Sequence, residues 1–166
     1  MGKIKLTNGQ YTIVDSEFHK SVSAFSWNCS ENGYACRTAK IGNKWTRVYL
    51  HRELAETPKG MSTDHINGNR LDNRKKNLRV CSHAENCRNK GNRIDNKTGY
   101  KGVFPYRNGR FRVKIKLDGK MLHVGLYDTA DEAARAYNRK AKELFGKYAR
   151  LNEVKRLGKK QHTDKP

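Results

Sequence analysis

An aspartate and a histidine stand side by side at Asp64-His65, near the start of a stretch that runs to about residue 90. A Gly/Asn turn and a dense run of basic residues follow the pair, and amide side chains come later at Asn77 and Asn86. Cleavage of a phosphodiester needs a nucleophilic water, a metal ion to offset charge on the scissile phosphate, and help for the leaving oxygen. These residue types are suited to hold one divalent cation and to activate one water beside a phosphate.

Each residue of the pair has its own predicted role. His65 is suited to act as general base, because a neutral imidazole near pH 7 can take a proton from water. Adjacent side chains on a strand point to opposite faces, so Asp64 can bind a hard cation such as Mg²⁺ while His65 faces the water. Asn86 would add a neutral oxygen ligand from a helix over residues 83–90. Water and phosphate would complete the coordination sphere, as Mg²⁺ prefers.

Other metal-binding patterns are weak in this chain. The cysteines have spacings that miss the short pattern of structural zinc sites, so we expect reduced thiols at Cys29, Cys36, Cys81 and Cys87. His51 follows an apolar strand end, and two interpretations of it stay open. It either faces the catalytic pocket or is a histidine hydrogen-bonded within the scaffold.

At these residues the chain resembles the HNH nuclease family, in its phage and intron-encoded homing-endonuclease branch. The motifs that carry the resemblance, in order, are Asp64-His65-Ile66-Asn67-Gly68-Asn69, Leu71-Asp72-Asn73-Arg74, Asn77-Leu78-Arg79 and Glu85-Asn86. The resemblance implies a ββα-metal fold with His65 as general base and with Asp64 and Asn86 as metal ligands. It also implies that Asn77 bridges the loop and helps to hold His65. Asn86 stands where the family often has histidine, so the predicted ligands fit a zinc-like site less well than a one-metal site with oxygen ligands.

The composition points to a polyanionic partner. The chain has 166 residues, with 36 Lys and Arg against 16 Asp and Glu and a net charge of +20. Nucleic acid is the first candidate partner and an anionic membrane surface the second. No apolar run approaches the roughly 18 residues of a membrane span, and the N-terminus lacks a signal-peptide core. We therefore expect a soluble, cytoplasmic protein, in a bacterial host cell if the gene is phage-encoded.

The elements that position the pair are expected within residues 1–92. Two antiparallel hairpins are predicted ahead of it, one turning at Asn8-Gly9 and one at Gly42-Asn43, followed by a short helix over residues 51–56. Trp27 and Trp45 are expected in the core of this part, where they would support the site, rather than as base-stacking platforms.

Residues 100–153 are predicted to form a separate unit. Apolar and basic residues alternate over residues 111–117, which predicts a strand with one apolar and one basic face. A turn at Asp118-Gly119 leads to a partner strand, and an earlier strand spans about residues 102–106. A helix that begins after Thr129, with a capping-box pattern to Glu132, is expected to cover the apolar face. The basic face would remain open to a partner.

This second unit is similar to the plant APETALA/ethylene-response-factor DNA-binding domain. The similarity is carried by Tyr100-Lys101-Gly102-Val103, Gly109-Arg110-Phe111, Gly125-Leu126-Tyr127-Asp128-Thr129-Ala130, Glu132-Ala133-Ala134-Arg135-Ala136-Tyr137, Phe145-Gly146 and Leu151-Asn152. The resemblance implies that the sheet enters the DNA major groove. Lysine replaces arginine at several groove-facing positions, Phe104 replaces another arginine, and His123 replaces a tryptophan. Because lysine lacks the planar fork that reads guanine, we expect modest sequence specificity.

The combined prediction is an α+β protein. It comprises a ββα-metal (HNH) nuclease domain with N-terminal β-hairpins (1–92), a linker (93–99), a three-stranded antiparallel sheet packed on one helix (100–153), and a basic, disordered tail (154–166). The residues expected to contact DNA are Arg70, Arg74, Lys75, Lys76, Lys101, Tyr106, Arg110, Arg112, Lys114, Lys116 and His123.

The expected activity is metal-dependent hydrolysis of phosphodiester bonds in double-stranded DNA. It would use one divalent cation, Mg²⁺ or Mn²⁺, and no small-molecule cofactor. The alternative is a non-catalytic, sequence-specific DNA-binding protein with a retired nuclease fold. An RNA-binding protein fits the charge but not the sheet, because the A-form major groove is too narrow for a β-ribbon. One site per chain would nick DNA as a monomer or cut both strands as a dimer, and we expect the monomer.

Overall fold

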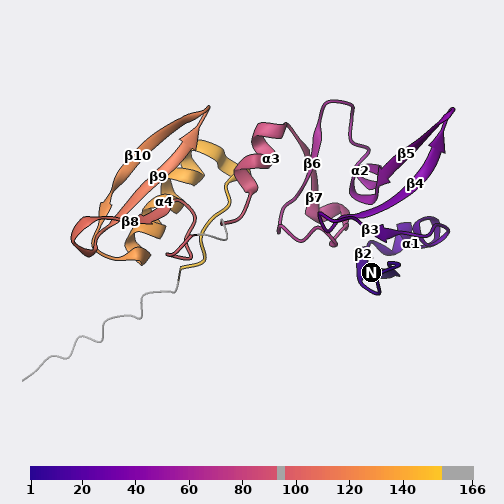
Figure 1. Cartoon of the computed structure of the whole chain (residues 1–166), viewed down its shortest axis with the longest axis horizontal. Helices are drawn as coiled ribbons and strands as arrows, with labels where there is room; N and C mark the ends of the chain where they lie inside the picture. The colour runs from indigo at the N-terminus through magenta and orange to yellow at the C-terminus, as the bar shows by residue number, and fades with distance from the viewer. Residues whose placement is uncertain (93–95, 155–166) are drawn as a thin grey trace, which may run out of the picture. The chain divides into compact units, whose positions relative to one another are not determined.

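The computed structural model describes residues 1–92 and 96–154 and divides the chain into two compact units, Met1–Lys90 and Gly91–Pro166. Both units combine small antiparallel sheets with a few helices (Figure 1). Each unit is described by itself below. Among the described residues, no helix has the length and apolar character needed to cross a membrane.

The first unit begins with an antiparallel hairpin and a helix. Strands β1 (Gly2–Lys5) and β2 (Tyr11–Val14) pair across a turn in which Gly9 has a positive φ of 85°, as the Asn-Gly signal predicts. Helix α1 (Ser16–Ser23) follows. The core of this unit consists of Ile4, Leu6, Val14, Val22, Trp27, Ala35 and Leu50. The prediction for Trp27 is confirmed, since it is 1% exposed and its Nε1 donates to the Val22 carbonyl.

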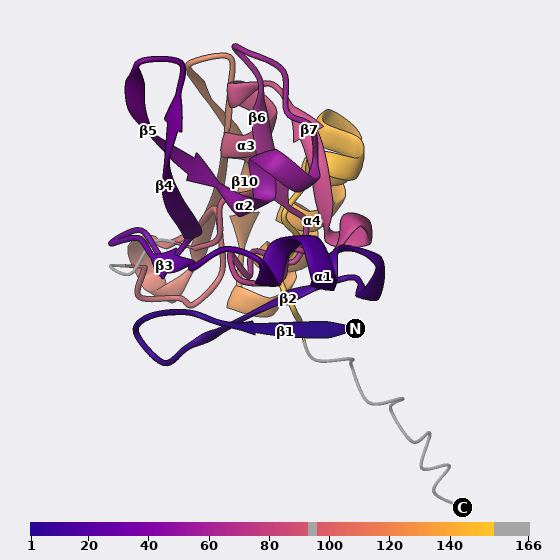
Figure 2. The same ribbon diagram turned by 90° about the vertical axis from the view of Figure 1, so that its right-hand side faces the viewer.

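A three-stranded sheet ordered β3-β4-β5 comes next, made by β3 (Asn28–Cys29), β4 (Ala35–Ile41) and β5 (Lys44–Tyr49). Beyond the short β3, strands β4 and β5 continue as a two-stranded ribbon that stands away from the rest of the unit in both views (Figures 1 and 2). The prediction that Trp45 lies in the core is wrong, because its side chain is 73% exposed. Among the described residues, the outer four positions of β5 are exposed and only Val48 and Tyr49 at its inner end are half-buried, so the Trp45 side chain does not pack into a core.

The Asp64-His65 pair lies in a strand-strand-helix arrangement. Strand β6 (Ser62–His65) pairs antiparallel with β7 (Leu78–Cys81), and helix α3 (His83–Asn89) follows directly. Ser82 and Glu85 form a reciprocal capping box, which fixes the start of α3. A short helix α2 (Leu50–Leu54) precedes β6, and a 3₁₀ turn η1 (Lys75–Asn77) precedes β7. The helices predicted over residues 51–56 and 83–90 are thus present, with boundaries shifted by one or two residues.

Strand β2 is also bonded to the loop between β6 and β7. The Ile13 amide donates to the Leu71 carbonyl at 2.8 Å, and the Asn73 amide donates to the Ile13 carbonyl at 2.8 Å. Ile13 and Asp72 accordingly form a parallel bridge. The N-terminal hairpin therefore supports the loop that follows His65, although the two segments are far apart in the sequence.

The second unit is a three-stranded antiparallel sheet covered by one helix. Strands β8 (Val103–Pro105), β9 (Phe111–Leu117) and β10 (Lys120–Tyr127) lie in the order β10-β9-β8, and helix α4 (Ala130–Phe145) packs on all three. Short 3₁₀ turns η2 (Arg107–Gly109) and η3 (Gly146–Tyr148) complete it. The buried core is Val103, Val113, Ile115, Ala133, Ala134, Tyr137, Ala141 and Phe145. The predicted apolar face and its helical cover are confirmed.

Both ends of α4 follow from local chemistry. Thr129 caps the helix, because its hydroxyl oxygen accepts from the Glu132 amide at 3.2 Å. Gly146, with a positive φ of 50°, ends it. Within the predicted linker, Thr98 donates its amide to Asn96 Oδ1 and its hydroxyl to the Val103 carbonyl, so this turn is tied to β8. Residues 93–95 of that linker, and all but residue 154 of the predicted tail, lie outside the described residues.

Candidate active site

Asp64 and His65 lie at the end of β6, and both side chains are buried, with 5% and 4% exposure. Their contacts go to different partners. Asp64 stands opposite Arg79 in the β6–β7 register and bonds to it, whereas the His65 ring bonds to Asn73 in the loop. The predicted division of the pair between two sides of the strand end agrees with these contacts.

The Asp64 carboxylate is held by three N–H groups. Arg79 donates from Nε at 2.8 Å and from Nη2 at 2.5 Å to Oδ2, and Asn89 donates from Nδ2 at 2.9 Å to Oδ1. A carboxylate offers about four lone-pair directions, so these contacts leave about one direction for a further ligand. A hard cation that prefers oxygen fits that remaining position.

The amide that contacts Asp64 comes from Asn89, which the sequence interpretation did not single out. Asn89 is buried, and its Nδ2 also contacts the His65 carbonyl at 3.0 Å. The predicted ligand Asn86 is half-buried and lies three residues earlier on α3, which places the two amides on the same face of the helix. This three-residue spacing between two amides was the available signal for Asn89.

A series of hydrogen bonds determines which nitrogen of His65 carries its proton. The Thr12 hydroxyl donates its one hydrogen to the Leu71 carbonyl at 2.9 Å, so it accepts from Asn73 Nδ2 at 2.7 Å. The amide oxygen of Asn73 is thereby directed at His65 Nε2, 3.0 Å away. Because this oxygen can only accept, Nε2 carries the hydrogen, and Nδ1 of the neutral ring keeps a lone pair.

Burial lowers the pKa of His65 from its ordinary value, while the Asn73 bond and the Asp64 and Asp72 charges oppose this shift. The net direction keeps the ring neutral at pH 7. A neutral imidazole with a lone pair on Nδ1 is the form that a general base requires.

Asn77 lies where the resemblance implied, between the two ends of the loop that follows His65. Its Oδ1 accepts from the Asn67 amide at 3.0 Å, its Nδ2 donates to the Asp72 carbonyl at 2.7 Å, and its own carbonyl accepts from Ile66 at 2.9 Å. These bonds fix the backbone next to His65. Asn77 therefore acts on the histidine through the loop.

The basic residues of the loop have different surroundings. Arg74 pairs with the buried Asp72 through Nε at 2.6 Å and Nη2 at 2.5 Å, and this pairing lowers the pKa of Asp72. The Arg74 guanidinium therefore stabilises the loop through its pair with Asp72. Arg70 donates to the Asn32 carbonyl and lies over the Tyr34 ring.

The next two basic residues of the run are lysines, and both are exposed. Lys75 lies over the Phe18 ring, with its ammonium 4.6 Å from the ring centroid. Its ammonium is also 4.0 Å from a carboxylate oxygen of Glu17. Lys76 adds a second exposed positive charge beside it.

His51 belongs to an aromatic cluster beside His65. Its ring centroid lies 4.8 Å from that of Tyr34, 5.6 Å from Tyr49 and 5.2 Å from His65. Burial, with smaller electrostatic contributions from His65 and Arg52, lowers the pKa of His51 to about 3. Its buried Nδ1 has no hydrogen-bond partner among the described residues. His51 is thus a neutral ring next to the candidate base.

The second unit carries the predicted basic row on its sheet. Arg112, Lys114 and Lys116 alternate with buried residues along β9, and the exposed His123 pairs with Lys114 from β10. The guanidinium of Arg112 lies 5.0 Å from the centre of the Tyr106 ring. These residues lie together on the face opposite to α4.

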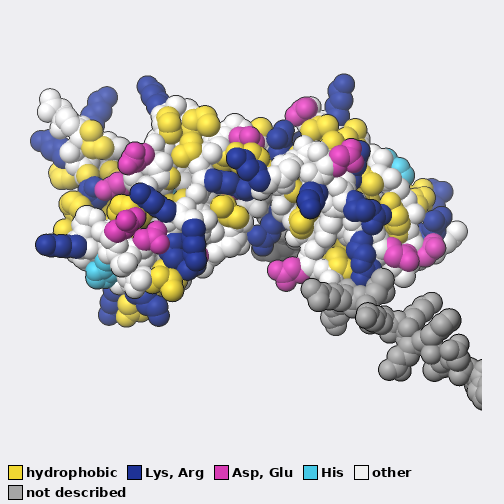
Figure 3. Space-filling model, turned by 180° about the vertical axis from the view of Figure 1, so that it is seen from behind, with side chains coloured by type: hydrophobic (Ala, Val, Ile, Leu, Met, Phe, Trp, Pro, Cys, Tyr) yellow, Lys and Arg dark blue, Asp and Glu magenta, His cyan; other side chains and the backbone are white. Residues whose placement is uncertain are grey.

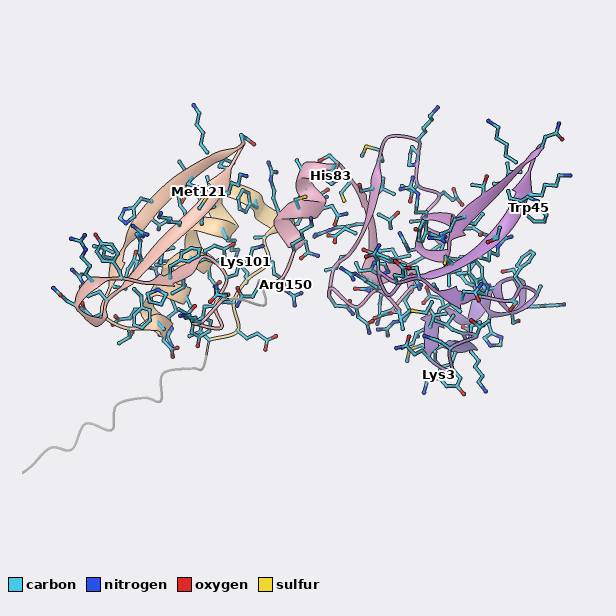
Figure 4. All side chains as sticks on the ribbon, in the orientation of Figure 1. Lys3, Trp45, His83, Lys101, Met121 and Arg150 are labelled. Carbon is cyan, nitrogen blue, oxygen red and sulfur yellow. The ribbon has the colours of Figure 1, made fainter. Side chains whose placement is uncertain are left out.

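Two further residues predicted to contact DNA have other neighbours. Arg110 pairs with Asp128 at 3.0 Å. Lys101 is half-buried, with its backbone bonded to Asn152, and Figure 4 shows it close to Arg150. Burial, together with the Arg150 charge, lowers the pKa of Lys101 to about 8. Lys101 thus lies beside the segment that follows α4.

The cysteines give no sign of a metal site. All four are free thiols, and burial raises the pKa of the Cys36 and Cys81 thiols. Within residues 1–92 and 96–154, no three His, Cys, Asp or Glu side chains gather as metal ligands. A cation at Asp64 would therefore be completed by amide, water and phosphate oxygens.

Comparison with known proteins bears on this strand-strand-helix arrangement. The sequence model of the HNH endonuclease family matches residues 48–88. The chain contains an HNH endonuclease domain. The HNH segment includes Asp64, His65, Asn77 and Asn86, and it excludes Thr12, which orients the Asn73 amide.

A relative supports the same assignment. The chain is 27% identical over 148 residues to an uncharacterized HNH endonuclease of Acanthamoeba polyphaga mimivirus, covering 88% of this chain and 76% of the relative. Together the two matches support nuclease activity on DNA at the level of the family. HNH nucleases typically use a divalent metal ion.

Proposed function

We propose that this protein is a metal-dependent DNA endonuclease of the homing type, with a ββα-metal site built from β6, β7 and α3. The observation that carries the proposal is a neutral His65 whose Nδ1 lone pair is left available by the Nε2 bond to Asn73. This ring lies next in sequence to a carboxylate that retains room for a cation.

In the proposed reaction, His65 takes a proton from the attacking water at Nδ1. Asp64 and Asn86 would hold one divalent cation, Mg²⁺ or Mn²⁺, through oxygen. The ion would supply charge stabilisation at the scissile phosphate and at the leaving oxygen. Asn77 keeps the loop, and through it the His65 backbone, in one position while the proton moves.

The second unit would bring this site to double-stranded DNA. We propose that its sheet docks in the major groove as an APETALA-type module, with Arg112, Lys114, Lys116 and His123 facing the DNA. The row of positive side chains opposite to α4 supports this proposal. Electrostatic contact with phosphates supplies affinity, and lysine-based readout of base edges gives modest specificity.

One observation favours a second candidate, a DNA-binding protein that does not cleave. The Arg79 guanidinium occupies Asp64 Oδ2, where a cation would compete with it. The complete set of Asp64, His65, Asn77 and Asn86 favours the enzyme, because it supplies two oxygen ligands, a base and a residue that holds the loop in one segment.

The test is incubation of supercoiled plasmid with the protein and Mg²⁺, with and without EDTA. We expect nicked or linear product that EDTA prevents. His65→Ala should abolish cleavage while gel-shift affinity is kept, and His83→Ala, an exposed histidine on α3, should cleave normally. Absence of product over a range of salt and metal concentrations would reject the enzyme and leave the DNA-binding protein.

A further inference from the structure

The β4–β5 ribbon has two chemically different faces, which its register defines. Lys40 pairs with Trp45, Thr38 with Arg47, and Cys36 with Tyr49. Directly paired side chains lie on the same face of an antiparallel pair, and alternate pairs share that face. One face therefore carries, from the turn inward, Lys40, Trp45, Thr38, Arg47 and Tyr49, here named the ribbon track.

The outer part of the ribbon track is exposed to water. Trp45 is 73% exposed, and Lys40 and Arg47 are also exposed. Figure 4 shows Trp45 near the outer end of the β4–β5 hairpin. An exposed aromatic side chain combined with neighbouring cations is the combination that proteins use to bind nucleic-acid strands.

The inner end of the ribbon track reaches the candidate active site. Interaction of the Arg47 guanidinium with the Tyr49 hydroxyl oxygen raises the pKa of Arg47. The Tyr49 ring lies 5.6 Å from the ring of His51, which in turn lies 5.2 Å from the ring of His65. The ribbon track thus runs along β5 from Trp45 to Tyr49, and ring contacts continue from Tyr49 through His51 to His65.

The charge of this region selects the partner. No Asp or Glu occurs between Glu31 and Glu53, while the ribbon carries Arg37, Lys40, Lys44 and Arg47. Figure 3 shows basic side chains interspersed with acidic ones on the visible surface of each unit, so it is the local sequence that sets the ribbon apart. Lys40 and Arg47 supply the positive charge of the ribbon track itself, since Arg37 and Lys44 lie on the opposite face. Positive charge beside a nuclease site is complementary to a phosphate backbone.

We propose that the ribbon track binds double-stranded DNA next to the scissile phosphate, and this inference rests on the proposed function. Lys40 and Arg47 contact phosphates, and Trp45 packs against sugars and base edges in a groove. Strands rise roughly 3.3 Å per residue, so the four steps from Trp45 to Tyr49 span about 13 Å. That length corresponds to about four base pairs. The track therefore fixes how far the cut lies from the hairpin contact.

Intrinsic fluorescence tests this proposal, because the chain has two tryptophans and Trp27 is 1% exposed. The binding experiment uses His65→Ala protein in EDTA with a 20-base-pair duplex, so that no cleavage occurs. DNA should change the emission, and Trp45→Phe should remove most of that change. Trp45→Ala should weaken binding about tenfold, as the loss of an aromatic contact to nucleic acid does.

The two lysines beside the turn provide a matched comparison. Lys40 lies on the ribbon track, whereas Lys44 pairs with Ile41 on the opposite face. Lys40→Ala and Arg47→Ala should each reduce the slope of log K against log salt by about 0.9. Lys44→Ala should change it much less. Equal effects of Lys40→Ala and Lys44→Ala, or an emission that DNA does not alter, would overturn the proposal.

Two further arms separate the alternatives. If vesicles of phosphatidylserine and phosphatidylcholine shift the Trp45 emission and DNA does not, the ribbon binds membranes and the inference fails. Plasmid cleavage is scored separately in the protein with His65 intact. Cleavage without any track effect would reject only this inference, and track-dependent binding without cleavage would reject only the proposed enzyme.

Discussion

His65 Nε2 and Asn73 Oδ1 are 3.0 Å apart, and Asn73 is itself held by Thr12 of the N-terminal hairpin. The relationship gives the imidazole both an orientation and a tautomer. Neither property follows from the adjacent Asp64, whose carboxylate bonds to Arg79 and Asn89. The chemical state of the candidate base is thus set by residues on its other side.

Replacement of Asn73 should change the tautomer of His65 more than it changes the fold of the first unit. In Asn73→Ala, His65 Nε2 loses its acceptor, so both tautomers become populated and kcat falls about tenfold to a hundredfold, with KM little changed. The tautomer is measured by ¹⁵N NMR of the imidazole. Unchanged nitrogen shifts in Asn73→Ala would show that Asn73 does not set the tautomer.

Thr12 offers a second test of how the His65 ring is oriented, because it contacts Asn73 and not the ring itself. Thr12→Ser keeps the hydroxyl and should leave the His65 nitrogen shifts as they are. Thr12→Val keeps the shape but leaves Asn73 Nδ2 without its acceptor, which costs about 1 to 3 kcal/mol. It should also perturb the His65 shifts. If Ser and Val variants behave alike, the hydroxyl has no part in orienting the ring.

Arg79 and a cation should substitute for one another at Asp64. Arg79→Ala leaves a buried carboxylate without its ion pair, which should lower the free energy of unfolding by about 3 kcal/mol. Mg²⁺ should then raise Tm more in this variant than in the unmodified protein, since it restores positive charge at Oδ2. Lys75→Ala, which removes an exposed pair with Glu17, is the control and should show no metal effect. Equal Mg²⁺ responses in all three proteins would show that no cation binds at Asp64.

The stability of the first unit should fall as the pH drops below the ordinary histidine pKa. Because the pKa of His51 is about 3 in the folded protein and 6.5 without its surroundings, the unfolded chain takes up the proton first. Stability is therefore complete above pH 6.5 and declines towards pH 3. Between pH 7 and pH 5 the loss should be about 2 kcal/mol.

His51→Gln removes this titration, so denaturation of that variant should depend less on pH. His65 contributes with the same sign, because its pKa is also lowered, and a smaller dependence should remain. A variant with the full dependence of the unmodified protein would contradict the burial of a neutral His51.

The basic row of the second unit should contribute to DNA affinity through charge. Lys114→Ala and Lys116→Ala should each reduce the salt slope by about 0.9, with similar losses on unrelated sequences. Lys140→Ala on α4, where the lysine pairs with Glu143, is the control and should leave the slope unchanged. Gel shifts over a series of salt concentrations measure this. A slope that survives both sheet variants would exclude these lysines as phosphate contacts.

Two glycines separate the cost of a clash from the cost of backbone strain. Gly102 and Gly109 have positive φ of 74° and 69°, but a Cβ at Gly102 would lie 2.2 Å from the Tyr137 ring, whereas one at Gly109 meets nothing. Gly109→Ala should cost about 1 kcal/mol. Gly102→Ala should cost about 2 kcal/mol more, because α4 must move from β8. Amide hydrogen exchange at Val113 compares the two, and equal protection would contradict the close packing of Tyr137.

The sequence was sufficient where structure depends on nearby residues. The alternation over β9, the Asp118-Gly119 turn and the Thr129 cap each depend on a few neighbours, and each appears as predicted. The sequence was insufficient where the burial of a side chain depends on whether another layer packs on its strand. Alternation indicates which side of β5 Trp45 occupies but not whether another layer lies against that side.

Within the candidate site, the sequence indicated residue types but not partners. The Asp64-His65 pair was recognisable from its types and spacing. The bond between Asn73 and Thr12 joins residues 61 positions apart, and no local pattern predicts it. Arg74 as a DNA contact stays a prediction, and the run of basic residues did not reveal that its guanidinium pairs with the buried Asp72.

The bonds from β2 to residues 71–73 limit how the nuclease part can be transplanted into another protein. A fragment trimmed to the family match would contain Asp64 and His65 but would lack Thr12 and Ile13. The Leu71 carbonyl and the Asn73 amide would then lose their hydrogen-bond partners. A graft would therefore have to include the N-terminal hairpin, so the segment to transfer is the whole first unit, Met1–Lys90.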